Sequence, residues 1–241
     1  MNRIEEELGT PLFLRSKKGL ELTAAGGRFY QEAQVLEQQW EIVKQSVHDE
    51  VSTPQGTIRL GCHSAVAQYT LPGFLPRFLK EFPKIRFYFS HGLSRHMTEE
   101  VISSKIDVAL AVNPISHPDL VIKEICKDEV TVWKSKNCLN PNILMLEPSL
   151  MQSQDILKKF DRANLTFENY LESSSLEVIA QLLVSGTGCA ILPERVVNAY
   201  ADKNIERIKN APIFNDRICL VYKPNFKKTR RGLVFLEKFH L

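Results

Sequence analysis

Residues 4–26 read IEEELGTPLFLRSKKGLELTAAG and hold the most specific local pattern of the chain. Ile4 and Leu8 lie four positions apart, so they share one face of a helix. Gly9 follows directly, and glycine commonly ends helices because it adopts the left-handed conformation without strain. The stretch therefore opens with the end of a helix.

A basic two-stranded ribbon is predicted to follow this helix. Leu12 and Phe13 are apolar anchors for an incoming strand, and a lysine-rich turn precedes the return strand. Leu20 and Leu22 alternate on that return strand, as a half-buried hairpin requires. Thr23 is a good N-cap, so a second helix is expected to start there.

The same residues resemble the winged helix-turn-helix of LysR-type transcriptional regulators. The shared pattern is I/L-E-x-x-L-G-x-x-L-F-x-R, a basic turn and L-T-x-A-G, and it stands here at positions 4–15 and 22–26. In that family the helix ending at Gly9 is the recognition helix and two helices precede it, whereas this chain begins inside the recognition helix. We therefore expect an N-terminally truncated member whose hold on DNA is weakened.

The resemblance also implies which side chains face double-stranded DNA. Basic residues on the wing are placed to contact phosphates or the minor groove, and one on the recognition helix could reach a base edge or a phosphate. Such phosphate contacts add affinity that depends on salt and not on base sequence. The predicted DNA-binding residues are Arg3, Arg15, Lys17 and Lys18.

Composition excludes several classes of protein. Charged residues make up 24% and apolar residues 44% of the chain, which is typical of a soluble globular protein, and the net charge of +3 permits but does not demand a nucleic-acid partner. We find no apolar run of about twenty residues and no signal peptide, so we expect no membrane association and a cytoplasmic location.

No motif in the chain predicts catalysis, a metal or a cofactor. P-loop, GxGxxG and HExxH patterns are absent, and His63 beside Cys62 lacks partners at ligand spacing. We expect neither an enzyme nor a cofactor. The five cysteines are dispersed and read as reduced thiols, with a redox switch of the kind conceivable in some members of the resembled family as the alternative. The basic cluster at 227–231 reads as a solvated turn.

A long polar helix is predicted between residues 28 and 53. Its apolar residues follow a heptad spacing, which is typical of a helix that needs a partner. The alternatives are packing on its own domain and dimerisation, and the resemblance favours the second because the family has a dimer-forming linker helix here. The predicted seam comprises Phe29, Ala33, Leu36, Trp40, Val43 and Val47.

After a hinge at 52–56, strands and helices alternate at lengths typical of βαβ units, which indicates an α/β sheet with right-handed crossovers. The expected strands are 57–61, 85–90, 107–112, 130–133, 143–146, 165–167, 190–192 and 218–222. The expected helices are 71–82, 95–104, 150–160, 176–184 and 231–239.

This part of the chain resembles the LysR effector domain. The matching segments, in order, are Leu71-Pro72 through Phe82-Pro83, His91-Gly92-x-Ser94, Asp107-Val108-Ala109, and Val184 through Pro193. The resemblance covers the whole chain and implies a bilobed fold of the type 2 periplasmic-binding-protein kind. The expected domains are a partial DNA-binding domain at 1–22, a linker helix at 23–53 and an effector domain at 57–241, with lobe one at about 57–134 and 212–241 and lobe two at about 135–211.

The effector is expected where strand ends meet helix N-termini, because free N–H groups and the helix dipole attract an anion. Hydroxyl groups beside such donors suit a carboxylate-bearing metabolite, although serine at a helix start is most often only a cap. The predicted effector-binding residues are Ser64, Ala65, Ser94 and Arg95 in lobe one and Ser175 and Gly188 in lobe two.

Together these patterns predict a LysR-type transcriptional regulator controlled by a small, anionic effector bound between two lobes. A homodimer is expected, and assembly to a homotetramer is implied by the resemblance alone. The main alternative is a truncated module that dimerises and binds effector but no longer reads DNA. An enzyme or a transport receptor on the same scaffold is a third possibility, since fold does not fix function.

Overall fold

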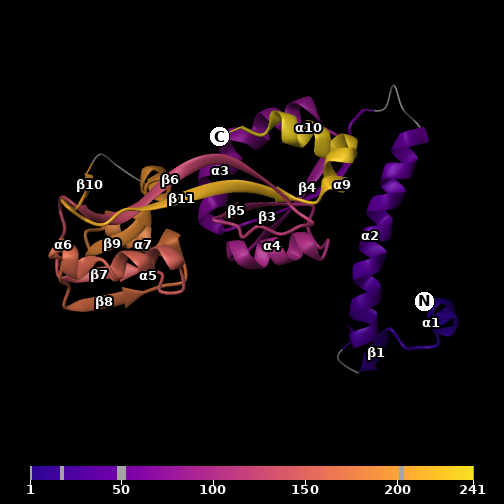
Figure 1. The fold of residues 1–241 in the computed structure, drawn as a ribbon, viewed down its shortest axis with the longest axis horizontal. Coiled ribbons are helices and arrows are strands. Elements are labelled where there is room, and N and C mark those ends of the chain that lie inside the picture. The colour runs from indigo at the N-terminus through magenta and orange to yellow at the C-terminus, as the bar shows by residue number, and fades with distance from the viewer. Residues whose placement is uncertain (1, 17–18, 48–52, 201–203, 241) are drawn as a thin grey trace.

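A computed structural model describes residues 2–16, 19–47, 53–200 and 204–240. Figure 1 shows a small N-terminal unit and one long helix at one end of the molecule, followed by a large mixed α/β body. Predicted DNA-binding residues Lys17 and Lys18 lie outside the described residues. The α/β architecture predicted from the sequence is confirmed.

The N-terminal unit consists of helix α1 (Asn2–Leu8) and a hairpin of β1 (Phe13–Ser16) and β2 (Gly19–Leu22). Gly9 ends α1 with a φ of 63°. The Glu5 carboxylate accepts hydrogen bonds from the N–H groups of Leu12 (2.6 Å) and Phe13 (3.1 Å), which ties the helix to the first strand. The two strands pair antiparallel, as predicted.

The burial of this hairpin differs from the prediction. Leu12 is buried, but Leu20 and Leu22 on the return strand are both exposed, so the expected half-buried face does not exist within the described residues. A two-stranded ribbon has no second layer of its own to cover such a face. The alternation of apolar residues therefore indicates a surface here, not a core.

Helix α2 (Ala24–Val47) follows directly, and Thr23 caps it. The Thr23 Oγ1 accepts a hydrogen bond from the Gly26 N–H (2.9 Å), while the Thr23 N–H donates to the Leu12 carbonyl (3.0 Å). An ion pair between Glu37 and Arg59 (3.5 Å) connects α2 to the first strand of the large body. The long helix predicted in this region is thus present from residue 24 to 47.

A continuous mixed sheet forms the large body. The strands run in the order β4-β3-β5-β11-β6-β9-β7-β8, and β10 pairs with β6. Strand β3 is parallel to β4 and β5, whereas β11 is antiparallel to β5 and β6. The strands are β3 (Gly56–Cys62), β4 (Ile85–His91), β5 (Val108–Val112), β6 (Val121–Ser135), β7 (Ile143–Leu146), β8 (Asn169–Glu172), β9 (Cys189–Pro193), β10 (Ile205–Arg207) and β11 (Phe214–Tyr222).

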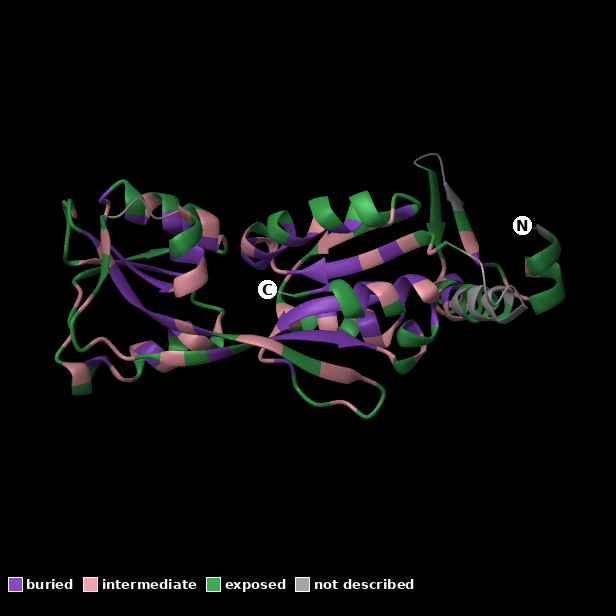
Figure 2. Ribbon diagram, turned by 90° about the horizontal axis from the view of Figure 1, so that it is seen from above, coloured by how far each residue is buried: buried purple, intermediate pink, exposed green. Residues whose placement is uncertain are grey.

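Two of these strands join the halves of the body. Figure 1 shows β6 and β11 running side by side from one half to the other, and Figure 2 shows buried residues on both sides of the crossing. Both strands begin earlier than predicted. Strand β6 begins at Val121 and not at 130, and β11 begins at Phe214 and not at 218. The longer strands form because they pair with each other along most of their length.

Eight helices in the described part of this body cover the sheet. They are α3 (Ser64–Glu81), α4 (Ser94–Ile102), α5 (Met151–Leu157), α6 (Phe160–Ala163), α7 (Leu176–Val184), α8 (Glu194–Tyr200), α9 (Pro224–Lys228) and α10 (Arg230–Lys238). The predicted start at residue 71 is wrong, because α3 begins at Ser64 and carries Pro72 and Pro76 inside it. The strand predicted at 165–167 is also wrong, because the edge strand is β8.

Each half has its own core. An aromatic cluster around Phe74, Phe78 and Phe235 fills the half that contains β3, β4 and β5, and a second apolar cluster lies under α7 and β9. The prediction of a solvated basic turn at 227–231 is wrong for Arg231, because its guanidinium is buried and lies 3.9 Å from the Asp107 carboxylate. The body is therefore bilobed, with one sheet shared by both lobes.

Candidate functional site

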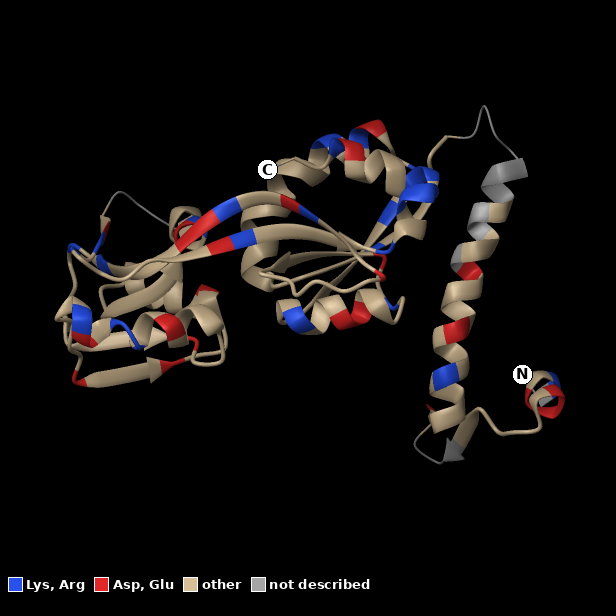
Figure 3. Ribbon diagram, in the orientation of Figure 1, with Lys and Arg blue, Asp and Glu red and all other residues tan. Residues whose placement is uncertain are grey.

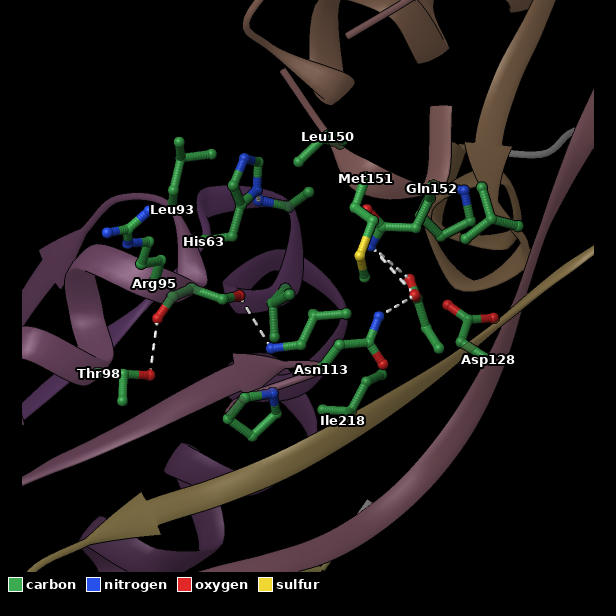
Figure 4. Close-up of a pocket in the computed structure, with 18 of the residues that line it drawn as sticks. His63, Leu93, Arg95, Thr98, Asn113, Asp128, Leu150, Met151, Gln152 and Ile218 are labelled. Carbon is green, nitrogen blue, oxygen red and sulfur yellow. Dashed lines mark hydrogen bonds between the residues drawn. The ribbon is translucent and has the colours of Figure 1, made fainter. Parts of the chain in front are cut away.

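A cavity of about 670 Å³ lies between the two lobes. Its walls come from the start of α3, the start of α4, the segment after β5, the start of α5, and the strands β6, β9 and β11 (Figure 4). Most of its lining is apolar, with polar groups concentrated at a few points. This is the arrangement expected of a small-molecule site.

The start of α3 forms one wall. His63 is the N-cap of α3, and its Nδ1 accepts a hydrogen bond from the Ala65 N–H (3.2 Å). Burial lowers the pKa of His63, against the opposing influence of Glu177 and Glu147, so the ring is neutral near pH 7. Ala65, a predicted site residue, is buried and lines the cavity.

Ser64 has a different position from the predicted one. It does not line the cavity but lies near the carboxylate of Glu177, which belongs to the other lobe. Burial raises the pKa of Glu177, but the nearby Ser64 hydroxyl, its own N–H and Ser175 together hold that pKa below its usual value. Ser64 is thus close to the other lobe but outside the lining of the cavity.

The start of α4 forms a second wall. Its N-cap, Leu93, has no side-chain cap, so the first N–H groups of α4 lack a side-chain acceptor. Ser94 lines the cavity, and its Oγ accepts a hydrogen bond from the Val112 N–H (2.8 Å). Arg95 also lines the cavity, with its side chain 88% exposed and its Nε 3.1 Å from Glu99 Oε1. The predicted residues Ser94 and Arg95 therefore both lie at the cavity, beside the uncapped start of α4.

Two carboxylates form the floor. Asp128 on β6 and Asp216 on β11 are partners in the strand register, and they are 6% and 3% exposed. The Asn113 side chain donates to Asp216 Oδ1 (2.6 Å), and the Gln152 side chain donates to Asp216 Oδ2 (3.0 Å), as the dashed lines in Figure 4 show. Burial raises the pKa of Asp216 and raises that of Asp128 to about 6.

The two predicted residues of lobe two lie outside the lining of the cavity. Ser175 caps α7, since its Oγ accepts from the Val178 N–H (3.2 Å) and donates to Glu177 Oε2 (2.8 Å). Gly188 packs against β7, where a Cβ would lie 2.8 Å from the Ile143 carbonyl oxygen. Lobe two instead contributes Leu150, Met151, Gln152, Ile191, Pro193 and Val196 to the lining.

Sequence reasoning missed the polar floor. Asp128 precedes the strand predicted at 130–133 and looks like part of a charged surface run, and Asp216 precedes the strand predicted at 218–222. Only the pairing of β6 with β11 brings them together, and that pairing joins segments far apart in the chain. The missed residues are Asn113, Asp128, Gln152 and Asp216.

The predicted DNA-facing and dimerisation residues lie at the opposite end of the chain. Arg3 is exposed on α1 beside three glutamates (Figure 3), and the backbone of Arg15 lies in β1. On α2 the seam is uncovered, with Leu36 70% and Trp40 60% exposed. The other seam residues are Phe29 and Val43, which are exposed, Ala33, which is half-buried, and Val47, whose side chain is outside the described set.

Other chemistry is sparse in the described part of the chain. It contains no group of three or more His, Cys, Asp or Glu residues placed to bind a metal ion. None of its helices combines the length and apolar character that crossing a bilayer requires. All five cysteines are free thiols, and burial raises the pKa of Cys62 to about 12 and that of Cys189 to about 11.

The fold and the cleft together define a class of protein. A winged hairpin, a long linker helix and a bilobed domain with a cavity between its lobes describe a ligand-responsive, DNA-binding protein of the periplasmic-binding-protein-like type. The model of the LysR substrate binding domain matches residues 52–239. The chain therefore belongs to the LysR family of transcriptional regulators.

Individual relatives agree with this assignment. The HTH-type transcriptional regulator YofA of Bacillus subtilis (strain 168) is 24% identical over 100% of this chain and 86% of its own length. Among solved structures, a full-length OxyR variant from Pseudomonas aeruginosa is similar with a TM-score of 0.76 and 20% identity, covering 99% of this chain and 83% of that one. Full-length CbnR complexed with its target DNA is similar with a TM-score of 0.58 and 20% identity, covering 99% and 86%.

Proposed function

We propose that this chain regulates transcription by binding DNA as a dimer, under the control of a small molecule that enters the cleft between its lobes. The observation that carries the effector part is the cavity itself, which opens on the uncapped start of α4 and lies between two lobes that share β6 and β11. An anionic group of the effector binds at that helix start, near Ser94 and Arg95.

Effector binding acts by favouring one arrangement of the lobes. A contact that joins the lobes flanks the cavity: the Tyr200 hydroxyl donates a hydrogen bond to the Gln68 side chain. A molecule that contacts both lobes stabilises the arrangement in which its contacts are complete, and it shifts the population towards that arrangement. The shift reaches DNA through β3 and α2, which meet at the Glu37–Arg59 ion pair.

We place the domains as the sequence predicts, with the DNA-binding unit at 1–22, the linker helix at 23–53 and the effector domain at 57–241. The change of partner along β6, from β11 to β9 near Val130, supports a lobe boundary a few residues before 134. The exposed seam of α2 forms the dimer, and assembly of dimers into tetramers remains part of this proposal. The similar structure of full-length CbnR complexed with its target DNA supports the proposal that this chain binds DNA.

The same proposal assigns no enzymatic activity and no cofactor to the chain, and it places the protein in the cytoplasm, where the DNA is. The apolar cavity is fitted for binding, and its two carboxylates are side by side on neighbouring strands with no nucleophile between them among the lining residues. The truncated-module alternative makes one different prediction, which is that DNA binding does not depend on base sequence.

Fluorescence anisotropy with a labelled duplex tests this proposal. The duplex comes from the region upstream of the gene for this protein, a scrambled duplex is the control, and both are titrated at two salt concentrations. We expect tighter binding to the upstream duplex at both salt concentrations. Equal, weak binding to both duplexes that disappears at the higher salt concentration would contradict DNA reading and favour the effector-binding module.

A further inference from the structure

The floor of the cavity holds negative charge without a matching cation. Buried aspartates are almost always paired, because an isolated charge loses its hydration on burial. Among the described residues, neither Asp128 nor Asp216 forms an ion pair with a lysine or an arginine. Asp216 accepts bonds from two neutral amides, and Asp128 accepts bonds from the backbone N–H groups of Glu129 (2.9 Å) and Arg195 (3.3 Å).

The other charged groups around the cavity do not supply the missing cation. The side chain of Arg195 influences Asp128 only from beyond ion-pair distance, and Arg95 is exposed and paired with Glu99. His63 is held neutral by burial. Tyr69, His117 and Glu99 complete the titratable groups of the lining. Burial raises the pKa of Tyr69, so its hydroxyl stays neutral, and Glu99 adds further negative charge.

We propose that the effector carries a protonated amine or similar cationic group, which binds between Asp128 and Asp216, in addition to the anionic group at the start of α4. This inference rests on the proposed function of the cleft and specifies the chemistry of its ligand. The effector is then a small bipolar molecule, of which amino acids and their relatives are the simplest kind.

The two ends of the cavity are close enough for one small molecule. Ser94 at the start of α4 binds the N–H of Val112, and the next residue, Asn113, binds Asp216 through its side chain. Consecutive Cα atoms lie about 3.8 Å apart, so the anion-attracting and cation-attracting ends are separated by little more than one residue and its side chain. Figure 4 shows Asn113 and Gln152 converging at this floor.

The space between the two ends is apolar. Val66, Leu93, Leu150, Met151 and Ile218 line it, so a short hydrocarbon segment between the charged groups would be well accommodated. A purely anionic molecule would bring its charge towards two uncompensated carboxylates, which is unfavourable in a cavity with a mostly apolar lining. The charge distribution therefore selects against anions that lack an amine.

Matched probes test this inference by thermal shift and by calorimetric titration. Each set keeps one hydrocarbon group and varies the charged groups attached to it: leucine, isocaproate and isoamylamine; phenylalanine, hydrocinnamate and phenethylamine; and ε-aminocaproate, caproate and hexylamine. A library of small metabolites, sorted into bipolar, anionic, cationic and neutral molecules, extends the sets. We expect bipolar probes to raise the Tm of the wild-type chain more than either of their halves.

The variants D128N and D216N locate the effect, and E124Q is the matched control, because Glu124 is an exposed carboxylate on the same strand as Asp128. We expect each aspartate variant to bind bipolar probes about 10- to 100-fold more weakly, the range for one charge-assisted hydrogen bond, and anionic probes as well as before or better. Unliganded D128N and D216N with a Tm at or above that of wild type would show that folding is intact.

The possible outcomes separate this inference from the function on which it rests. If only anionic molecules raise the Tm, and D128N and D216N bind them as wild type does, the cationic end is overturned and the effector cleft stands. If no molecule of any charge class changes the Tm, both the inference and the effector cleft are overturned.

Discussion

Asp128 shows how a single buried carboxylate in the cleft lowers the free energy of unfolding at neutral pH. Burial, with the neighbouring charge of Asp216, raises its pKa from 3.8 to about 6. The folded chain therefore holds the Asp128 proton more tightly than the unfolded chain does, and the free energy of unfolding falls as the pH rises from about 4 to about 6. A pKa difference of this size corresponds to about 3 kcal/mol at neutral pH.

We predict that D128N is more stable than wild type at pH 7.5, by about 1 to 3 kcal/mol, and that the difference shrinks at pH 4.5, where the wild-type carboxyl is largely protonated. Guanidinium denaturation at the two pH values measures it. E124Q, which removes an exposed carboxylate from the same strand, should change stability by less than about 0.5 kcal/mol. A variant that is less stable than wild type at pH 7.5 would contradict the cost assigned to this charge.

Arg231 presents the opposite case, in which a buried charge has its partner. Its guanidinium lies 3.9 Å from Asp107 Oδ1, while Asp107 Oδ2 accepts a hydrogen bond from the Arg59 N–H (2.7 Å). Burial raises the pKa of Asp107, and Arg231 and Arg59 act against that rise. The pair joins the start of β5 to α10, next to the hinge at Gly56.

Replacing Arg231 with methionine should therefore cost about 3 kcal/mol of stability, because it leaves Asp107 buried without that cation. Chemical denaturation of R231M measures the loss, with K227M at an exposed neighbouring position as the control. The double variant D107N/R231M should recover part of the loss. Equal stability of R231M and the double variant would mean that the loss comes from packing and not from charge.

At the scale of elements, the junction between the hairpin and α2 depends on one glycine. A Cβ at Gly26 would lie 2.0 Å from the Leu12 carbonyl oxygen, which accepts the Thr23 N–H bond, whereas a Cβ at Gly27 would meet nothing within 4 Å. The strand end and the helix start can be this close only if position 26 lacks a side chain. The wing is thus held against α2 by backbone contact.

This contrast yields a prediction from adjacent substitutions. G26A should destabilise the hairpin–helix junction by at least about 2 kcal/mol, whereas G27A should be neutral or stabilise α2 by up to about 1 kcal/mol. Hydrogen exchange at the Thr23 amide measures local opening, and anisotropy with duplex DNA measures the effect on binding. Identical protection of Thr23 in both variants would show that this close approach is not required.

Local chemistry explains which elements could be predicted from the sequence. Three helix ends are set by the backbone or hydroxyl group of a nearby residue: Gly9, Thr23 and Ser175. The sequence predicts all three ends at the positions where the structure places them. The start of α3 could not be predicted in this way, because Pro72 imitates a first-turn proline although the helix already begins at Ser64.

The same difference between local and long-range chemistry decides which residues of the cleft could be predicted. Ser94 and Arg95 could be predicted, because a helix start after a strand is readable from nearby residues. Asp128 and Asp216 could not, because their position depends on β6 pairing with β11, and polar residues in those strands hide the pattern. The sequence therefore places Ser94 and Arg95 at the cavity and misses its floor.

At the scale of the whole molecule, α2 is held to the large body by little within the described residues. The Glu37–Arg59 ion pair is 3.5 Å long, and the Glu37 side chain is 61% exposed, so it contributes less than about 1 kcal/mol. A helix of 24 residues that exposes Trp40 and Leu36 is not stabilised by such a contact alone. A second copy of the helix along the seam would supply the missing apolar burial.

We therefore predict that L36E and W40E weaken the dimer at least about 30-fold, the loss typical of a central apolar or aromatic interface residue. Sedimentation velocity over a range of protein concentrations measures the dissociation constant. Q39E introduces the same charge at an exposed position of the same turn but off the seam, and it should leave the dimer intact. Because two wings on one duplex bind far more tightly than one, both seam variants should also lose affinity for the upstream duplex. If they become monomeric and still bind that duplex as tightly as Q39E does, DNA recognition is independent of the linker helix, and the seam serves another contact.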